Sequence, residues 1–319
     1  MRAILAVALT LFAAGAVAQT TPVDRPPRDV ALIDATHVLP PATPQRAAAS
    51  VLHGVTVPDP YRWLERADDP VVRDWIAAQN TYTEAELASM PQGKALTARV
   101  QQLAITSTTR SGPVLAGGSL FYMQQTPPQP QPVLMAQAWP DGAARTLIDP
   151  NATGGNTAIV AYWPSPSGRY LAYGTAEGGS ELTTIHVLDV ASGKALDDVL
   201  PWAGGGTTPQ GLAWDADERG FVYVRLPPPA AGKQVAQFNA AVAHHTLGQA
   251  PASDRVVFGQ HYARTAEYVL LSAPHAAQTA LLAYLGDGGA AEVFLRRNGK
   301  FEPVLGREAN VRTAAWVSG

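Results

Sequence analysis

Two short Gly-Gly-Ser stretches are the places where this chain could carry a nucleophilic serine. They are Gly117-Gly118-Ser119 and Gly178-Gly179-Ser180. In serine hydrolases the nucleophile occupies a Gly-x-Ser-x-Gly turn between a strand and a helix, which exposes its hydroxyl to a general base. Both stretches lack the second glycine and precede strand-like segments, so we interpret them as turns. We predict no catalytic residue in this chain.

The histidines and the paired acidic residues are the other groups that could do chemistry. His244 and His245 are adjacent, so on a strand their side chains would point to opposite faces and could not hold one metal ion together. We interpret Asp197-Asp198 and Asp215-x-Asp217 as solvated acids in turns, in preference to the carboxylate pair of a glycosidase. Two further histidines fall in expected loops without ligand spacing, His261 and His275. We therefore expect no metal site and no cofactor.

The composition limits the possible partners and the redox chemistry. The chain has 319 residues, of which 46% are hydrophobic and 15% charged, so it can bury a core as one large or two smaller units. A net charge of −3, without a basic stripe, argues against nucleic acid as a partner. Cysteine is absent, which excludes disulfides, thiol catalysis and thiolate metal sites.

The first 18 residues have the pattern of a secretory signal. Arg2 precedes an apolar run that is short for a membrane span, and the run ends in the small-x-small sequence Ala16-Val17-Ala18. We predict a signal peptide at residues 1–18 and an exported protein, periplasmic or secreted, with no membrane association after cleavage. Residues 19–50 are rich in Pro and Ala and cannot hold a core, so we expect a flexible or surface-wrapped arm.

A helical arm is expected over residues 51–104. Asp68 or Asp69 can cap a helix that begins at Pro70, continues to about Ser89 and ends at Pro91-Gln92-Gly93. Four of its residues recur at the spacing of one helix face, Val72, Trp75, Ile76 and Gln79. A second, shorter helix is expected over Lys94–Leu103.

From residue 111 to residue 319 the chain is expected to be all β. Short apolar runs alternate with turn dipeptides, without crossover helices. The expected strands are Leu120–Gln124, Val133–Trp139, Tyr170–Thr175, Thr183–Val190, Phe221–Leu226, Tyr268–Ala273, Ala280–Leu285 and Glu292–Arg296. Trp214 follows Trp163 by 51 residues and Trp316 follows Trp214 by 102, and a period near 50 is typical of β-propeller blades. The predicted blades are Ser111–Asp149, Ala158–Val199, Gly211–Phe258 and Tyr268–Leu305, with Trp316 at the start of a fifth.

The segment HGVTVPDPYRWLE, followed by WIAAQN, resembles the N-terminal arm of the prolyl oligopeptidase family of serine peptidases. Residues 165–200 look like one propeller blade of that family, and residues 212–225 and 245–254 are similar to the next, so the resemblance covers Leu52–Phe258. It implies a propeller that gates substrate, followed by an α/β-hydrolase domain with the Ser, His and Asp of the triad. It also implies cleavage of short peptides after proline.

Three expectations follow from this resemblance. Family propellers close with seven blades, so we expect an incomplete propeller, inactive alone, whose partner is the α/β-hydrolase domain missing from this chain. In the family, the turn before the third blade can approach the substrate with an aromatic residue. The matching segment here, Thr207–Gly211, has no aromatic residue, so we do not assign it a contact with substrate. We interpret Glu177–Glu181 as a structural turn. A stand-alone propeller used for binding, or an inactive truncated product, is the alternative function.

Overall fold

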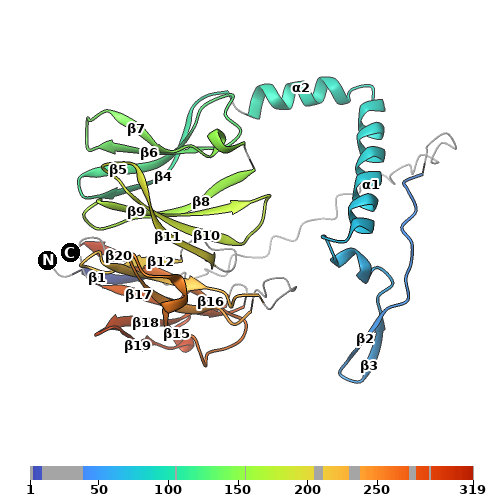
Figure 1. Ribbon diagram of the computed structural model, residues 1–319. Coiled ribbons are helices and arrows are strands. Elements are labelled where there is room, and N and C mark those ends of the chain that lie inside the picture. The colour runs from blue at the N-terminus through green and yellow to red at the C-terminus, as the bar shows by residue number, and fades with distance from the viewer. Residues whose placement is uncertain are drawn as a thin grey trace, which may run out of the picture. The chain divides into compact units, whose positions relative to one another are not determined.

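A computed structural model describes residues 3–8, 39–104, 106–154, 156–204, 211–229, 238–272, 278–286 and 289–318. The chain divides into two compact units (Figure 1). One comprises Gly15–Thr106, and the other comprises Met1–Ala14 together with Ser107–Gly319. No helix of the described residues is long and apolar enough to cross a membrane.

The unit Gly15–Thr106 is built on two helices and one hairpin. Its elements are β2 (Ala49–Leu52), β3 (Val55–Pro58), the 3₁₀ helix η1 (Arg62–Glu65), α1 (Pro70–Ser89) and α2 (Gly93–Ala104). The Asp69 carboxylate accepts a hydrogen bond from the backbone N–H of Val71, which confirms the predicted cap. Both predicted helices are present, and the hairpin β2–β3 was not predicted.

Helix α1 holds part of the preceding proline-rich segment. The Trp75 indole N–H donates to Thr43 Oγ1 at 3.1 Å, and Gln79 Nε2 donates to the carbonyl of Pro41 at 2.7 Å. Val72 is buried, whereas Ile76, which shares its predicted helix face, is 41% exposed. Because an extended segment donates few side chains to a core, its backbone carbonyls and hydroxyls bond the helix instead.

The second unit contains four four-stranded antiparallel blades. Blade 1 comprises β4 (Thr109–Ala116), β5 (Ser119–Gln125), β6 (Val133–Ala138) and β7 (Ala144–Ile148). Blade 2 comprises β8 (Thr157–Pro164), β9 (Tyr170–Glu177), β10 (Thr183–Asp189) and β11 (Lys194–Ala203). Blade 3 comprises β12 (Leu212–Trp214), β13 (Gly220–Arg225), β14 (Ala241–Thr246) and β15 (Arg255–Phe258). Blade 4 comprises β16 (Ala266–Ser272), β17 (Thr279–Leu285), β18 (Glu292–Arg297) and β19 (Lys300–Leu305).

A further strand, β20 (Thr313–Ser318), begins the next blade and contains Trp316. The four blades and the start of a fifth confirm the predicted partial propeller (Figure 1). Strand β20 pairs antiparallel with β1 (Ala3–Ala8), which lies within the predicted signal sequence. The signal peptide itself stays a prediction. Among the described residues, the 3₁₀ helix η2 (Pro150–Thr153) lies between blades 1 and 2, η3 (Pro251–Ser253) lies between β14 and β15 within blade 3, and η4 (Arg307–Ala309) precedes β20.

The hydrophobic core lies between neighbouring blades. Phe121 and Leu134 of blade 1 pack with Leu171 and Leu188 of blade 2. The same arrangement continues along the unit, with one cluster between blades 2 and 3, one between blades 3 and 4, and one between blade 4 and β20. Both faces of an inner blade are therefore covered by its neighbours, and burial of these faces is the main stabilisation of the unit.

Blades 2 and 3 are also joined through their backbones. Strand β11 pairs with β13 through Ala203 and Arg225, so the two blades form one eight-stranded sheet. This join was not predicted from the sequence, because it depends on an irregularity near the end of β11, where Trp202 has a φ of +57°. Blades 2 and 3 are therefore continuous through this one backbone pairing.

The tryptophan repeat has a direct structural counterpart. The Trp214 indole N–H donates to the carbonyl of Trp163 at 2.9 Å, and the Trp316 indole N–H donates to the carbonyl of Leu271 at 3.0 Å. Each acceptor is the penultimate residue of the first strand of the preceding blade. The repeat thus records a hydrogen bond between blades as well as the length of a blade.

Candidate functional site

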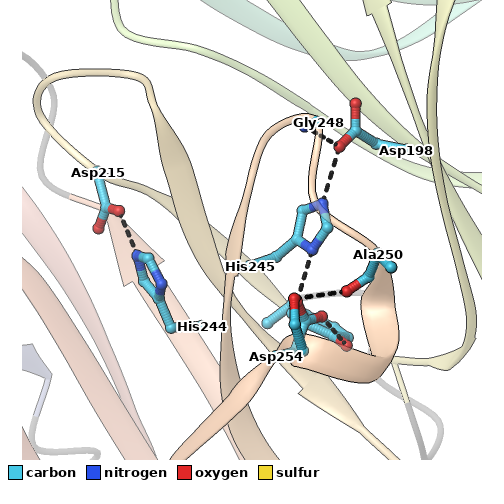
Figure 2. A network of polar contacts seen from close by, with 9 residues as sticks. Asp198, Asp215, His244, His245, Gly248, Ala250 and Asp254 are labelled. Carbon is cyan, nitrogen blue, oxygen red and sulfur yellow. Dashed lines mark hydrogen bonds and ion pairs between the residues drawn. The ribbon is translucent and has the colours of Figure 1, made fainter.

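A buried polar network surrounds His245 on β14. Its Nδ1 lies 2.8 Å from Asp254 Oδ1, and its Nε2 lies 2.9 Å from Asp198 Oδ1 (Figure 2). Asp254 follows η3 in blade 3, whereas Asp198 lies on β11 of blade 2. The imidazole is fully buried and both carboxylates are closed to solvent. The network therefore crosses the interface between blades 2 and 3.

Two further donors bond the carboxylates of this network. The backbone N–H of Gly248 donates to Asp198 Oδ1 at 2.6 Å, and the Tyr223 hydroxyl donates to Asp254 Oδ2 at 2.8 Å. Burial by itself lowers the pKa of His245, but the hydrogen bonds to Asp254 and Asp198 outweigh it and raise the pKa above the ordinary value. The imidazole is thus stabilised in its charged form.

A second histidine network lies on the opposite face of β14. His244 Nε2 lies 2.6 Å from Asp215 Oδ2, and Arg296 Nη1 of blade 4 lies 2.5 Å from Asp215 Oδ1. Burial raises the pKa of Asp215, but the hydrogen bonds from His244 and Arg296 outweigh it, so the pKa is lower than usual. Adjacent residues of a strand face opposite sides of the sheet. His244 therefore contacts Asp215, which also bonds Arg296 of blade 4, whereas His245 contacts Asp198 of blade 2. The two imidazoles thus contact different carboxylates on opposite faces of β14, as expected for adjacent strand residues.

The His245 network does not have the arrangement of a hydrolytic site. A general base needs one ring nitrogen oriented by an acid and the other facing the nucleophile. In His245 both ring nitrogens contact carboxylates, and the imidazole is closed to solvent. Among the described residues, no group of three or more His, Asp or Glu is arranged to hold a metal ion. The arrangement joins blades 2 and 3 through contacts between one imidazole and two carboxylates.

The acidic pairs need a correction. The interpretation of Asp198 and Asp215 as solvated turn acids is wrong, because Asp198 is 3% exposed and Asp215 bonds His244 and Arg296. Asp197 is exposed, and Asp217 accepts a hydrogen bond from the backbone N–H of Arg219 in a turn. The sequence did contain a signal for Asp198, since it alternates with Leu196 and Leu200 on β11 and therefore shares their inward face.

The two Gly-Gly-Ser stretches are turns, as predicted. Gly117 and Gly118 have φ values of +54° and +75° between β4 and β5, and Ser119 begins β5. Gly178 and Gly179 also have positive φ, and the backbone N–H of Ser180 donates to the carbonyl of Glu177. Neither serine precedes a helix.

The sequence also singled out His261, His275 and the turn at residues 207–211. His261 lies in an exposed turn, as expected, and contributes to neither network. His275 lies outside the described residues, as do residues 207–210 of the turn before blade 3. Gly211 of that turn directly precedes β12.

Residues 40–300 match the family described as the prolyl oligopeptidase N-terminal β-propeller domain. A prolyl endopeptidase of Elizabethkingia meningoseptica is 29% identical over 69% of this chain and 31% of its own length. The dual function macrocyclase-peptidase POPB of Galerina marginata is 25% identical over 64% of this chain and 30% of its own length.

Solved structures agree on the fold. A chain from a structural study of two prolyl endopeptidases is 28% identical, with a TM-score of 0.71, over 83% of this chain and 39% of its own length. Prolyl oligopeptidase B from Galerina marginata gives a TM-score of 0.64 at 21% identity, over 86% of this chain and 42% of that structure, and supports the fold alone. This chain therefore spans about a third of the curated relatives it matches.

Proposed function

Since this chain belongs to the prolyl oligopeptidase family, we propose that it is the substrate-gating propeller part of an exported serine endopeptidase that hydrolyses short peptides after proline. The observation that carries the proposal is the match of residues 40–300 to the family's N-terminal propeller domain. The name of the 29% identical relative, a prolyl endopeptidase, supports the choice of peptide bond. The partner in this proposal is an α/β-hydrolase domain that supplies the Ser, His and Asp of the triad.

The role proposed for the propeller is physical. Each interface between blades is packed with apolar side chains and tied by hydrogen bonds, so the blades form a stiff wall. A stiff wall over a reaction centre excludes bulky chains and bulk water without supplying a catalytic side chain. Short peptides are the substrates that such a wall admits.

Export is the second half of the proposal, and it is supported by the first 18 residues. Their single arginine, apolar run and Ala-Val-Ala ending have the composition that signal peptidase recognises. The mature chain would begin at Gln19. N-terminal sequencing of the protein from the cell envelope or medium tests this, and an intact Met1 would contradict it.

The experiment on activity uses the whole product of the native gene. It is incubated with matched fluorogenic dipeptides that differ only in having Pro, Ala or Arg before the reporter, and with the same Pro-containing sequence embedded in a folded protein. We expect cleavage of the Pro substrate alone and resistance of the folded protein. Cleavage after Arg would indicate the basic-residue-cleaving branch of the family, and peptide binding without cleavage would indicate a binding module. Either result would refute the proposed activity.

A further inference from the structure

The geometry around His245 constrains where protons can reside. Both ring nitrogens lie within 2.9 Å of carboxylate oxygens, and a neutral imidazole has one N–H to donate. If His245 were neutral and both carboxylates were ionised, the unprotonated ring nitrogen would lie against a carboxylate oxygen. Two lone pairs would then repel each other at hydrogen-bond distance. The observed contacts therefore require an extra proton on this network, and the imidazolium form supplies it at the ring.

We propose that His245 is a pH-sensitive latch between blades 2 and 3, closed while its imidazole carries two protons and opened on the Asp198 side when one proton leaves. Asp254 belongs to the same blade as His245, whereas Asp198 belongs to the neighbouring blade, so loss of the Asp198 contact loosens the interface. The proposal is independent of the peptidase activity proposed above.

The groups facing the imidazole come from four elements. Asp198 on β11 and Asp254 after η3 contact the imidazole directly. The Tyr223 hydroxyl on β13 bonds Asp254, and the backbone N–H of Gly248, in the turn after β14, bonds Asp198. Arg225 adds a positive charge beside Tyr223. The Phe221 ring lies against the imidazole, with 5.3 Å between ring centroids, and keeps water from that side. The network thus has two anions for one histidine, which favours the doubly protonated ring.

The direction of the pH dependence follows from the raised pKa of His245. A group whose pKa is higher in the folded state contributes stabilisation that is complete below its unfolded value, about 6.5 for histidine. That stabilisation is lost as the pH rises through the folded value. The latch is therefore closed in acidic solution, and its opening equilibrium rises about tenfold per pH unit between the unfolded value of about 6.5 and the folded value.

The test uses the 319-residue chain and two independent readouts. Nitrogen-15 NMR of the histidine rings reports whether His245 carries two protons at pH 7. Hydrogen exchange of the Gly248 amide, corrected for the intrinsic pH dependence of exchange, reports opening, because this amide donates to Asp198. We expect a doubly protonated His245 at pH 7, and loss of Gly248 protection of about tenfold per pH unit once the pH exceeds about 6.5.

Three variants separate the latch from general destabilisation. Asp198→Asn removes one of the two anions, so the midpoint of His245 titration should move to lower pH. Asp197→Asn makes the same chemical change at the adjacent exposed acid and should leave the midpoint unchanged. His245→Gln should remove the pH dependence of Gly248 protection. A neutral His245 ring at pH 7 in the unmodified chain, or equal midpoints for the two Asp→Asn variants, would overturn the proposal even if His245→Gln fails to fold.

Discussion

Replacing Trp214 with phenylalanine tests whether the hydrogen bonds between blades contribute to stability. The Trp214 side chain is 7% exposed, and its indole N–H donates to the carbonyl of Trp163 at 2.9 Å. Its ring stacks on Tyr170 and meets Phe221 edge to face. Phenylalanine keeps a ring for these contacts but cannot donate.

The expected magnitude has two parts. Loss of one hydrogen bond in a buried setting costs about 1 kcal/mol. The space left by the smaller ring adds about 1 kcal/mol at about 24 cal/mol per Å³ of cavity. The free energy of unfolding should therefore fall by about 2 kcal/mol, which for a unit of this size lowers Tm by about 4–8 °C.

Thermal and urea unfolding, followed by circular dichroism, measure this effect. Benzothienylalanine at position 214 keeps the size of the indole but lacks the N–H, so it should show only the hydrogen-bond part, about 1 kcal/mol. Trp139 is 56% exposed, and Trp139→Phe, the matched control, should change stability by less than about 0.5 kcal/mol. Equal stabilities for the Trp214 and Trp139 variants would show that this bond between blades contributes nothing.

Three further changes have expected outcomes. Gly117→Ala places a Cβ 1.7 Å from a carbonyl oxygen of the next blade at a φ of +54°, so it should lower the free energy of unfolding by more than about 2 kcal/mol. Gly118→Ala, which has open space at a φ of +75°, should lower it by about 1 kcal/mol. Urea unfolding measures both. Asp69→Ala removes the cap of α1 and should cost about 1 kcal/mol in the same assay, and Asp68→Ala, at an exposed residue, should cost less than half as much. Because the pKa of Asp215 is lowered, its contribution to stability is complete above the ordinary value, about 3.9, and is lost as the pH falls further. Asp215→Asn should therefore weaken the fall of Tm at acidic pH. An unchanged fall would contradict this reasoning.

The sequence predicted the two helices and the partial propeller, because their signals are local. Helix α1 begins after its capping Asp69 and ends at Ser89, as expected from the cap, the proline and the periodicity. The four blades follow from strand alternation and from glycines whose positive φ closes tight hairpins. The blade strands missed in the sequence are the last strand of each blade, β7, β11, β15 and β19, together with β4, β8, β12 and β14. Strands as short as β7 and β15 contain too few residues for a clear alternation.

What the sequence determined by itself is therefore each blade, its family and the repeat of the tryptophans. Only the tertiary structure decided how one blade is bonded to the next. His245 and Asp198 are 47 residues apart, and Trp214 and Trp163 are 51 apart, so no local pattern connects them. Strand periodicity shows which face of a sheet a side chain occupies. A carboxylate on that face becomes the partner of a buried histidine only when two sheets pack at about 10 Å, because this packing excludes the water that would otherwise solvate the carboxylate and the imidazole.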